Sequence, residues 1–292
     1  MSEQQETLCE SVKAGNYEAV KRHLQKSCID VDQSDDDTLT PLQWAAAVNA
    51  VEILLLLLWN NADAQKRTRQ GWTAAHIAAM RGHPACFQAL VDHNVDVSMQ
   101  DNYGQTPGHL AAAHGNTSCL EIFLDHWMNP EILDDNCWTL LHSAAFHGRI
   151  SCTELLVRRG LSVEATDKDG NTPVHLAAME GHVDVIKYFV SCARTPLYML
   201  DAPNDHGDTP ETLCGKFGKE DVMQFIKTFR LSEPRPCCAD QEIRQYQFPA
   251  HAAVYDGELT RVQSLIDNCI VRITDQDDHG STLLHVGKSM TD

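Results

Sequence analysis

The chain has 292 residues, of which 43% are apolar and 22% are charged. These proportions are those of a folded protein and exclude a chain that is disordered throughout. The 41 acidic residues outnumber the 23 basic ones and give a formal net charge of −18. A negative chain repels nucleic acids and acidic membrane surfaces, so we expect neither as a partner.

The sequence shows no targeting or membrane-spanning segment. Its first ten residues are polar and acidic, unlike a secretory signal peptide. The longest apolar run, 53–59, is far shorter than the ~20 residues that cross a bilayer. The eleven cysteines contain no Cys-x-x-Cys pair. We therefore expect reduced thiols in a cytoplasmic or nuclear protein.

A repeat runs along most of the chain. Its start is a Thr followed three positions later by His or Gln, as in Thr40-Pro-Leu-Gln and Thr172-Pro-Val-His. Nine unit starts are found, evenly spaced in the centre and slightly further apart towards the ends: Glu6, Thr40, Thr73, Thr106, Thr139, Thr172, Thr209, Phe248 and Thr282. The first start lacks Thr-Pro and is interpreted as a polar cap. The central period of ~33 residues indicates a stacked repeat architecture.

Each unit has the signals of two short helices. Thr is a favourable N-cap, and Pro fits the first turn because its missing N–H is not needed there. Gly nine residues after the start ends the first helix, with Asn49 as an exception. The second helix, such as 85–92, ends at Asn61, Asn94, Trp127 or Gly160, and the turn at Trp127 is expected to differ. Turn sequences such as 101–104 and 167–170 then predict a hairpin.

The units fall into four segments. We predict an N-terminal capping repeat at 1–39, repeats at 40–230, an inserted loop at 231–247 and a further repeat with a truncated final one at 248–292. Four extra residues between Val190 and Asn204 should lengthen one hairpin. The pattern stops after His285, which suggests a truncated isoform whose last helix has no partner.

The motif Thr-Pro-Leu-His-x-Ala resembles that of the ankyrin-repeat family, and the stretch 170–182 follows the family consensus closely. Stretches 71–79, 144–149 and 248–253 also resemble members that carry several such repeats. The resemblance implies an all-α ankyrin-repeat solenoid with short β-hairpins, of about eight units plus an incomplete last one. It also implies a non-catalytic protein that binds other proteins, and we expect a monomer.

The histidines and cysteines are interpreted as structural. Six histidines hold the fourth position of the repeat, where the family's His bonds adjacent turns: His76, His109, His142, His175, His251 and His285. Cys86, Cys119 and Cys152 each lie one repeat period apart on stacked helices, too far for a disulfide or shared zinc. No phosphate loop or catalytic motif is present, so we predict no enzyme, no cofactor and no metal.

The remaining candidate for function is a surface. Family members bind partners with their hairpin tips and the exposed side of the first helices, which together form a concave groove. The corresponding positions here are Arg69, Trp72, Arg81, Tyr103, Gln105, His114, Asn136, Trp138, Phe146, His147, Lys168 and Asn171. We call these twelve residues the candidate face.

Aromatic and Arg side chains are common interface anchors, which favours an adaptor or inhibitor that binds protein. The aromatic before each Thr could instead pack on its own hairpin. If Trp138 is an anchor, Trp138→Ala should weaken binding by more than ~2 kcal/mol with little loss of stability. The alternatives are a truncated isoform with little binding function and, less favoured, a metal-binding or enzymatic protein.

Overall fold

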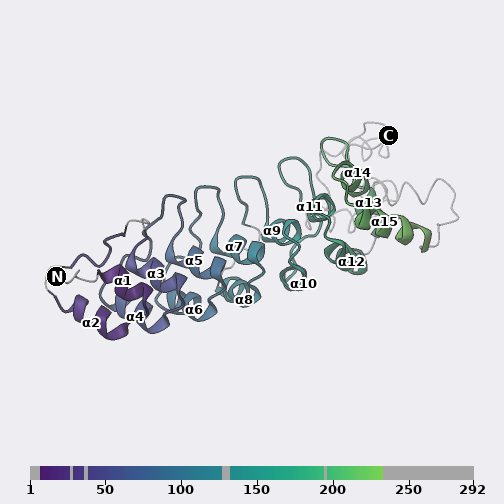
Figure 1. Ribbon diagram of the computed structural model, residues 1–292. Coiled ribbons are helices and arrows are strands. Elements are labelled where there is room, and N and C mark those ends of the chain that lie inside the picture. Colours follow the sequence, from purple (N-terminus) through teal and green to yellow (C-terminus); the bar gives the residue numbers. More distant parts are fainter. Residues whose placement is uncertain (1–6, 27–28, 36–38, 127–131, 194–195, 233–292) are drawn as a thin grey trace, which may run out of the picture.

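The computed structural model describes residues 7–26, 29–35, 39–126, 132–193 and 196–232, which form fifteen helices and no strand. Fourteen of these helices form seven antiparallel pairs that stack in chain order (Figure 1). The units that start at Phe248 and Thr282, the loop 231–247 from residue 233 onward, and Trp127 lie outside the described residues.

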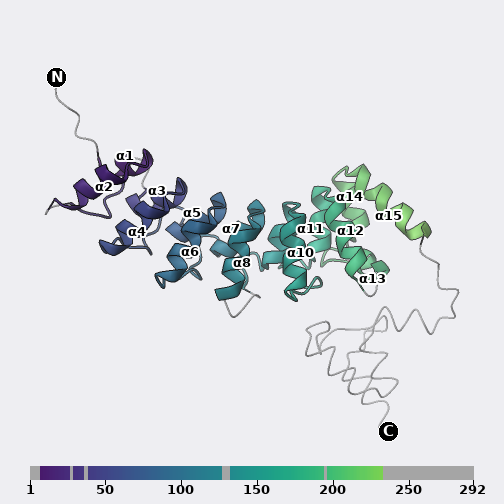
Figure 2. The same ribbon diagram turned by 90° about the horizontal axis from the view of Figure 1, so that it is seen from below.

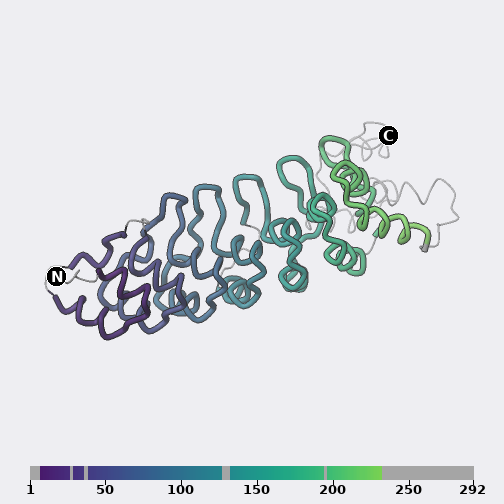
Figure 3. Tube along the Cα trace, in the orientation of Figure 1, coloured from purple at the N-terminus to yellow at the C-terminus, as the bar shows by residue number. Residues whose placement is uncertain are grey.

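The pairs build two parallel layers. The first layer holds one helix of each unit, with bounds α1 (Leu8–Lys13), α3 (Pro41–Ala47), α5 (Ala74–Arg81), α7 (Pro107–His114), α9 (Leu140–Phe146), α11 (Pro173–Glu180) and α14 (Pro210–Lys216). The second layer holds α2 (Tyr17–Leu24), α4 (Val51–Trp59), α6 (Pro84–Asp92), α8 (Thr117–His126), α10 (Ile150–Arg158), α12 (Val183–Cys192) and α15 (Glu220–Ser232). Figure 2 shows the two layers from below, and in Figure 3 the connecting loops project from the first layer in one direction.

The predicted Thr starts are the N-caps of the first-layer helices. Thr40, Thr139 and Thr209 accept a hydrogen bond from a backbone N–H of the first turn. The first unit corrects the sequence prediction, because its cap is Thr7 rather than Glu6, and Thr7 forms a capping box with Glu10. Thr7 lies one full repeat period before Thr40, so the first unit also starts with the repeat's Thr.

The helix ends follow the predicted Gly and Asn positions. Gly82, Gly115 and Gly181 adopt the left-handed conformation directly after the first helix. Asn49, which breaks the Gly pattern, takes the same conformation with φ of 59°, as an Asn can. The second-helix ends Asn61, Asn94 and Gly160 are also left-handed, as the sequence predicted.

The core is a continuous row of small and large side chains between the two layers. Most alanines of the first helices are fully buried, and Phe87, Phe123 and Phe189 fill the space behind them. Gly108 on α7 leaves room for one of these rings, because a Cβ there would lie 2.5 Å from Phe123 Cε1. Close helix packing therefore depends on small residues in the first layer.

The insertion before the seventh unit differs from the sequence prediction. Its residues contribute a short extra helix, α13 (Pro196–Asp201), between α12 and the next hairpin, instead of a longer hairpin. Met199 and Leu200 of α13 are buried, so apolar burial favours the helix. At the other boundary, α15 continues through Ser232, two residues into the predicted loop 231–247.

Candidate functional site

Each hairpin tip is closed by one side chain at its first turn position. Asp101 Oδ1 accepts hydrogen bonds from the N–H groups of Tyr103 and Gln105. In the other tips, the side-chain oxygen again accepts from the N–H groups two and four residues later in the chain. The residues that do so are Asp134, Asp167 and Asn204. These Asx turns hold the tips in one conformation, with a single backbone pair such as Asp101 N–H to Gln105 C=O beneath them. The predicted hairpins are thus tight turns in the described residues, without a strand ladder.

Successive tips are also joined to each other. Asp135 N–H donates to Tyr103 C=O at 3.1 Å, and Lys168 N–H donates to Asn136 C=O at 3.2 Å. The tips approach so closely that a Cβ on Gly104 would lie 2.6 Å from Asp135 N. The fifth unit has Cys137 where the neighbouring tips have Gly, and Cys137 adopts the same left-handed conformation, with φ of 60°. The sequence pattern did not predict this departure, for which the missing Gly is the available signal.

The fourth-position histidines link each first helix to the next hairpin. His142 Nδ1 accepts from Thr139 N–H at 3.2 Å, and its Nε2 donates to Asn171 C=O at 3.1 Å. His76, His109 and His175 make equivalent bonds. Since Nδ1 accepts, the ring must be neutral with its proton on Nε2. Burial lowers the pKa of all four rings, and that of His142 falls to about 4.

The structural role predicted for these four histidines is therefore confirmed, while His251 and His285 lie outside the described residues. In the second unit Gln43 replaces the His without changing the linkage. Its Oε1 accepts from Thr40 N–H, and its Nε2 donates to Lys66 C=O and Trp72 C=O. The linkage thus needs an acceptor and a donor in one side chain, with no requirement for a titratable group.

The two tryptophans of the candidate face bond to the following hairpin. Trp72 Nε1 donates to Asp101 Oδ2 at 3.1 Å, and Trp138 Nε1 donates to Asp167 Oδ2 at 3.2 Å. Both rings are half-buried. Each tryptophan thus has a structural contact with the next hairpin, which the sequence-based alternative of packing on its own hairpin did not include. We now expect Trp138→Ala to lower stability as well as any binding, in contrast to the sequence-based expectation.

Gln105 occupies the same position between these two tryptophans. The carboxylate opposite it, Asp134, is 6% exposed, and its Oδ2 has no hydrogen-bond partner within the described residues. The indole that would donate to Oδ2 in the neighbouring units is absent here. This junction therefore contains a buried acceptor without a donor.

A second set of contacts between units, missed in the sequence, caps the first helices at their C-terminal ends. The residue ten positions after the unit start reaches back to carbonyls of the preceding unit. Asn116 Nδ2 donates to Ala79 C=O at 2.7 Å and Met80 C=O at 2.8 Å, and Arg149 Nε donates to Ala113 C=O at 2.9 Å. His83 and His182 make the corresponding contacts. Because Asn, Arg and His can each donate to these carbonyls, no single residue type marks the cap in the sequence.

Three residues of the candidate face form one cluster. The rings of Trp138 and Phe146 lie 5.0 Å apart, and those of Phe146 and His147 lie 5.1 Å apart in an edge-to-face arrangement. Trp138 precedes α9, while Phe146 and His147 end it. A short helix therefore brings these three positions of the predicted face together.

The other members of the candidate face divide into exposed and bonded residues. Arg69, Arg81 and His114 are exposed, and Tyr103 is 63% exposed at a hairpin tip. Lys168 Nζ donates to Asn136 Oδ1 at 2.6 Å and so connects two tips. Asn171 is bonded within the stack, because it accepts from Asn204 and donates to Asp167. Trp72 and Asn171 thus have structural contacts, whereas Arg81, Tyr103 and His114 present their side chains to solvent.

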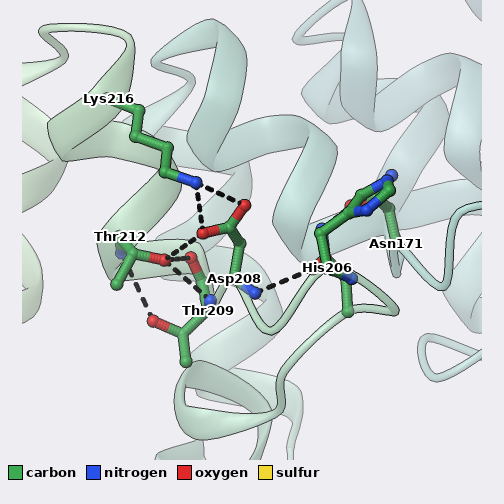
Figure 4. A network of polar contacts seen from close by, with 7 residues as sticks. Asn171, His206, Asp208, Thr209, Thr212 and Lys216 are labelled. Carbon is green, nitrogen blue, oxygen red and sulfur yellow. Dashed lines mark hydrogen bonds and ion pairs between the residues drawn. The ribbon is translucent and has the colours of Figure 1, made fainter.

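The seventh unit shows how the same architecture continues without a histidine. Thr212 holds the fourth position and bonds Thr209 and Asp208, and Lys216 Nζ pairs with both carboxylate oxygens of Asp208 (Figure 4). Asn204 closes this tip. These contacts stabilise the turn and the start of α14, and they account for the polar cluster seen there.

The thiols that recur once per unit on the second-layer helices are core residues. Cys86, Cys119 and Cys152 are buried. Burial raises the pKa of Cys86 to about 11 and that of Cys119 to about 12, which makes both poor nucleophiles at neutral pH. Among the described residues, no three His, Cys, Asp or Glu side chains gather as a metal site would require. None of the helices in the described part of the chain is long and apolar enough to span a bilayer.

Comparison with known proteins agrees with this architecture. The family model for ankyrin repeats, in sets of three copies, matches residues 8–101, 46–134, 93–167, 126–199 and 141–228. The ankyrin repeat domain of human ASB11 has a TM-score of 0.66 at 25% identity, over 79% of this chain and 99% of that one. The ankyrin repeat domain of Bcl-3, described as a member of the IkappaB protein family, has a TM-score of 0.62 at 24% identity, over 75% and 97%.

Two curated relatives match over shorter segments. A Caenorhabditis elegans homolog of the transient receptor potential cation channel subfamily A member 1 is 36% identical over 70 residues, 24% of this chain and 6% of that protein. The Dictyostelium discoideum 26S proteasome non-ATPase regulatory subunit 10 is 30% identical over 90 residues, 30% and 38% of the two chains. The matches thus span well under half the length of either relative.

The chain belongs to the ankyrin-repeat family, and its fold is the all-α ankyrin solenoid. Domains of this family bind other proteins and are typically non-enzymatic. The fold alone does not identify a partner, since the surface residues determine it.

Proposed function

We propose that this protein is a non-catalytic adaptor or inhibitor that binds a protein partner on the candidate face, inside the cytoplasm or the nucleus. The observation that carries the proposal is the cluster of Trp138, Phe146 and His147, with exposed Tyr103 and Arg81 on neighbouring units. Aromatic and Arg side chains of this kind supply most of the binding energy at protein interfaces.

The stack is suited to bind without rearranging. The tips are fixed by Asx turns and by bonds from tip to tip, and the first helices are tied to the next hairpin by histidines. A surface that is already ordered loses little conformational entropy on association. The cysteines of the described residues are free thiols, which supports a reducing intracellular setting.

The test is affinity purification with mass spectrometry, using the full chain as bait. The face variant is Tyr103→Ala/Phe146→Ala, and the matched control is Trp59→Ala/Arg158→Ala, which removes one exposed aromatic ring and a second large side chain from the second layer. Thermal melts confirm that both variants fold. We expect proteins that bind the wild-type chain and the control to be lost from the face variant. Recovery of the same proteins with both variants would refute binding at this face.

A further inference from the structure

A basic strip runs beside the aromatic cluster, although the whole chain carries a charge of −18. The four segments that contain the C-terminal ends of α5, α7, α9 and α11 are 74–83, 107–116, 140–149 and 173–182. In these segments Glu180 is the one acidic residue. Their basic residues at the helix ends include Arg81, His114, His147, Arg149 and His182, which we call the basic strip.

Strip residues of three adjacent units lie within electrostatic range of one another. Burial has the largest effect on the pKa of His147 and lowers it. The charges of Arg149, His114 and His182 lower it further, whereas Glu180 raises it. Partial burial and then the charge of Arg149 lower the pKa of His114, although the residue remains exposed. His114 and His147 are therefore neutral at pH 7, and the permanent positive charge of the strip lies on Arg81 and Arg149.

Arg149 is held in one orientation by the fold. Its Nε donates to Ala113 C=O at 2.9 Å, and its stem lies along Gly115, with Cδ 3.1 Å from where a Cβ would be. Within the described residues its terminal NH₂ groups make no hydrogen bond. A planar guanidinium fixed in this way presents two parallel donors, the arrangement that binds a carboxylate in bidentate fashion.

We propose that the partner recognised by this face presents an acidic side chain next to an apolar one. The apolar side chain packs against Trp138 and Phe146, and the carboxylate pairs with Arg149 at the basic strip. The cluster and the strip are continuous, because the Phe146 ring contacts the His147 ring. The positive charge of Arg81 and Arg149 is complementary to an acidic segment and opposite in sign to the net charge of the chain. This inference rests on the proposed function and specifies the chemistry of the partner.

The chain itself offers a variant that removes the charge and keeps the fold. Asn116 holds the position of Arg149 one unit earlier and caps the preceding helix through its amide. Arg149→Asn should therefore preserve the cap on α7 while removing the guanidinium. Arg158→Asn on α10, an exposed residue of the second layer, makes the same change of charge away from the face.

The experiment is selection of a random dodecapeptide library on phage against the full 292-residue chain, followed by fluorescence polarisation with the enriched peptides. We expect the peptides to carry Asp or Glu within a few positions of Leu, Ile or Phe. We also expect affinity to fall at least tenfold with Arg149→Asn and to stay within twofold for Arg158→Asn.

Enriched peptides without acidic residues, or unchanged affinity in Arg149→Asn, would overturn the acidic-partner inference. If the same peptides were still lost with Tyr103→Ala/Phe146→Ala, the proposed function would stand without it. Peptides that bind both of these variants as well as the wild-type chain would refute both proposals. Tighter binding of a short single-stranded RNA, lost with Arg149→Asn, would assign the strip to a nucleic acid instead.

Discussion

At the residue scale, one side chain at the fourth position of each repeat joins a helix start to the next hairpin. The bond geometry requires a neutral imidazole, and burial keeps it neutral by lowering its pKa. Acid should therefore weaken the bond between helix start and next hairpin in the units with His. The unit with Gln43 has no titratable group in this bond, so acid should leave it unchanged.

The first prediction concerns acid stability. In the unfolded chain His142 titrates near 6.5, and in the folded chain its pKa is about 4. Since the unfolded state binds the proton first, this contribution is complete above pH 6.5 and is lost as pH falls from 6.5 towards 4. With a pKa lowered from 6.5 to about 4, the complete loss amounts to about 3 kcal/mol for a single such group. His142→Gln should fold, and chemical denaturation should show a smaller loss of stability between pH 7 and pH 4.5. An unchanged pH slope would exclude His142 as a source of acid sensitivity.

The second prediction supplies a hydrogen-bond donor to Asp134 Oδ2, which has no partner within the described residues. Gln105→Trp would place an indole N–H where Trp72 and Trp138 place theirs, opposite Asp134 Oδ2. Satisfying a buried acceptor should raise the free energy of unfolding by about 1 kcal/mol. Gln105→Phe is the control, because it adds the ring without the donor. Equal stability of the two variants would show that ring packing, and no hydrogen bond, accounts for the gain.

At the element scale, helices of six to ten residues in the first six pairs are too short to be stable alone. Each first-layer helix receives a cap at its start from its own Thr and, in the central units, a cap at its end from the following unit. The hairpins are likewise completed by their neighbours through the bonds from tip to tip. Secondary structure in this chain is therefore stabilised by packing between units.

The third prediction concerns the hairpin of the fifth unit. Cys137 has φ of 60°, a conformation that costs about 1 kcal/mol for a residue with a Cβ. Cys137→Gly should stabilise the protein by up to that amount, as measured by urea denaturation. The opposite change, Gly104→Ala, should destabilise it by more, because the Cβ would lie 2.6 Å from Asp135 N. A destabilised Cys137→Gly variant would indicate that the thiol makes compensating contacts.

At the scale of the whole molecule, each repeat contacts its neighbours in chain order, as the layers of Figure 1 show. The stability of such a stack is close to a sum of repeat and interface contributions. Substitutions at two distant junctions between repeats should then change the free energy of unfolding independently of each other.

The fourth prediction tests this independence. Asn116→Ala removes the cap on α5, and His175→Gln alters the junction between the sixth and seventh units. The first change should cost about 1 kcal/mol and the second less than that. The double variant should equal the sum within about 0.5 kcal/mol by chemical denaturation. A larger deviation would mean that the units couple beyond their nearest neighbours.

Much of the fold could be predicted because the residues that determine the local structure occupy fixed positions in each repeat. Thr at the start, Gly or Asn at the ends and His at the fourth position each have one conformational or bonding role. The cap from Asn116, Arg149 and His182 was not predicted, because three residue types share this one role. The sequence prediction also placed the first start at Glu6 instead of Thr7. The extra residues near α13 form a helix instead of the predicted longer hairpin.

The candidate face could be predicted only as a set of positions. The repeat period placed Trp138, Phe146 and His147 on one surface, and the structure shows their rings in contact. Which residues of that set remain available to a partner depends on neighbours in the adjacent unit, as with Trp72 and Asn171. Sequence alone determined the repeat, its helices and its turns, because these depend on residues close in the chain. The tertiary structure decided which side chains join the units and which face solvent, because that depends on how adjacent units stack.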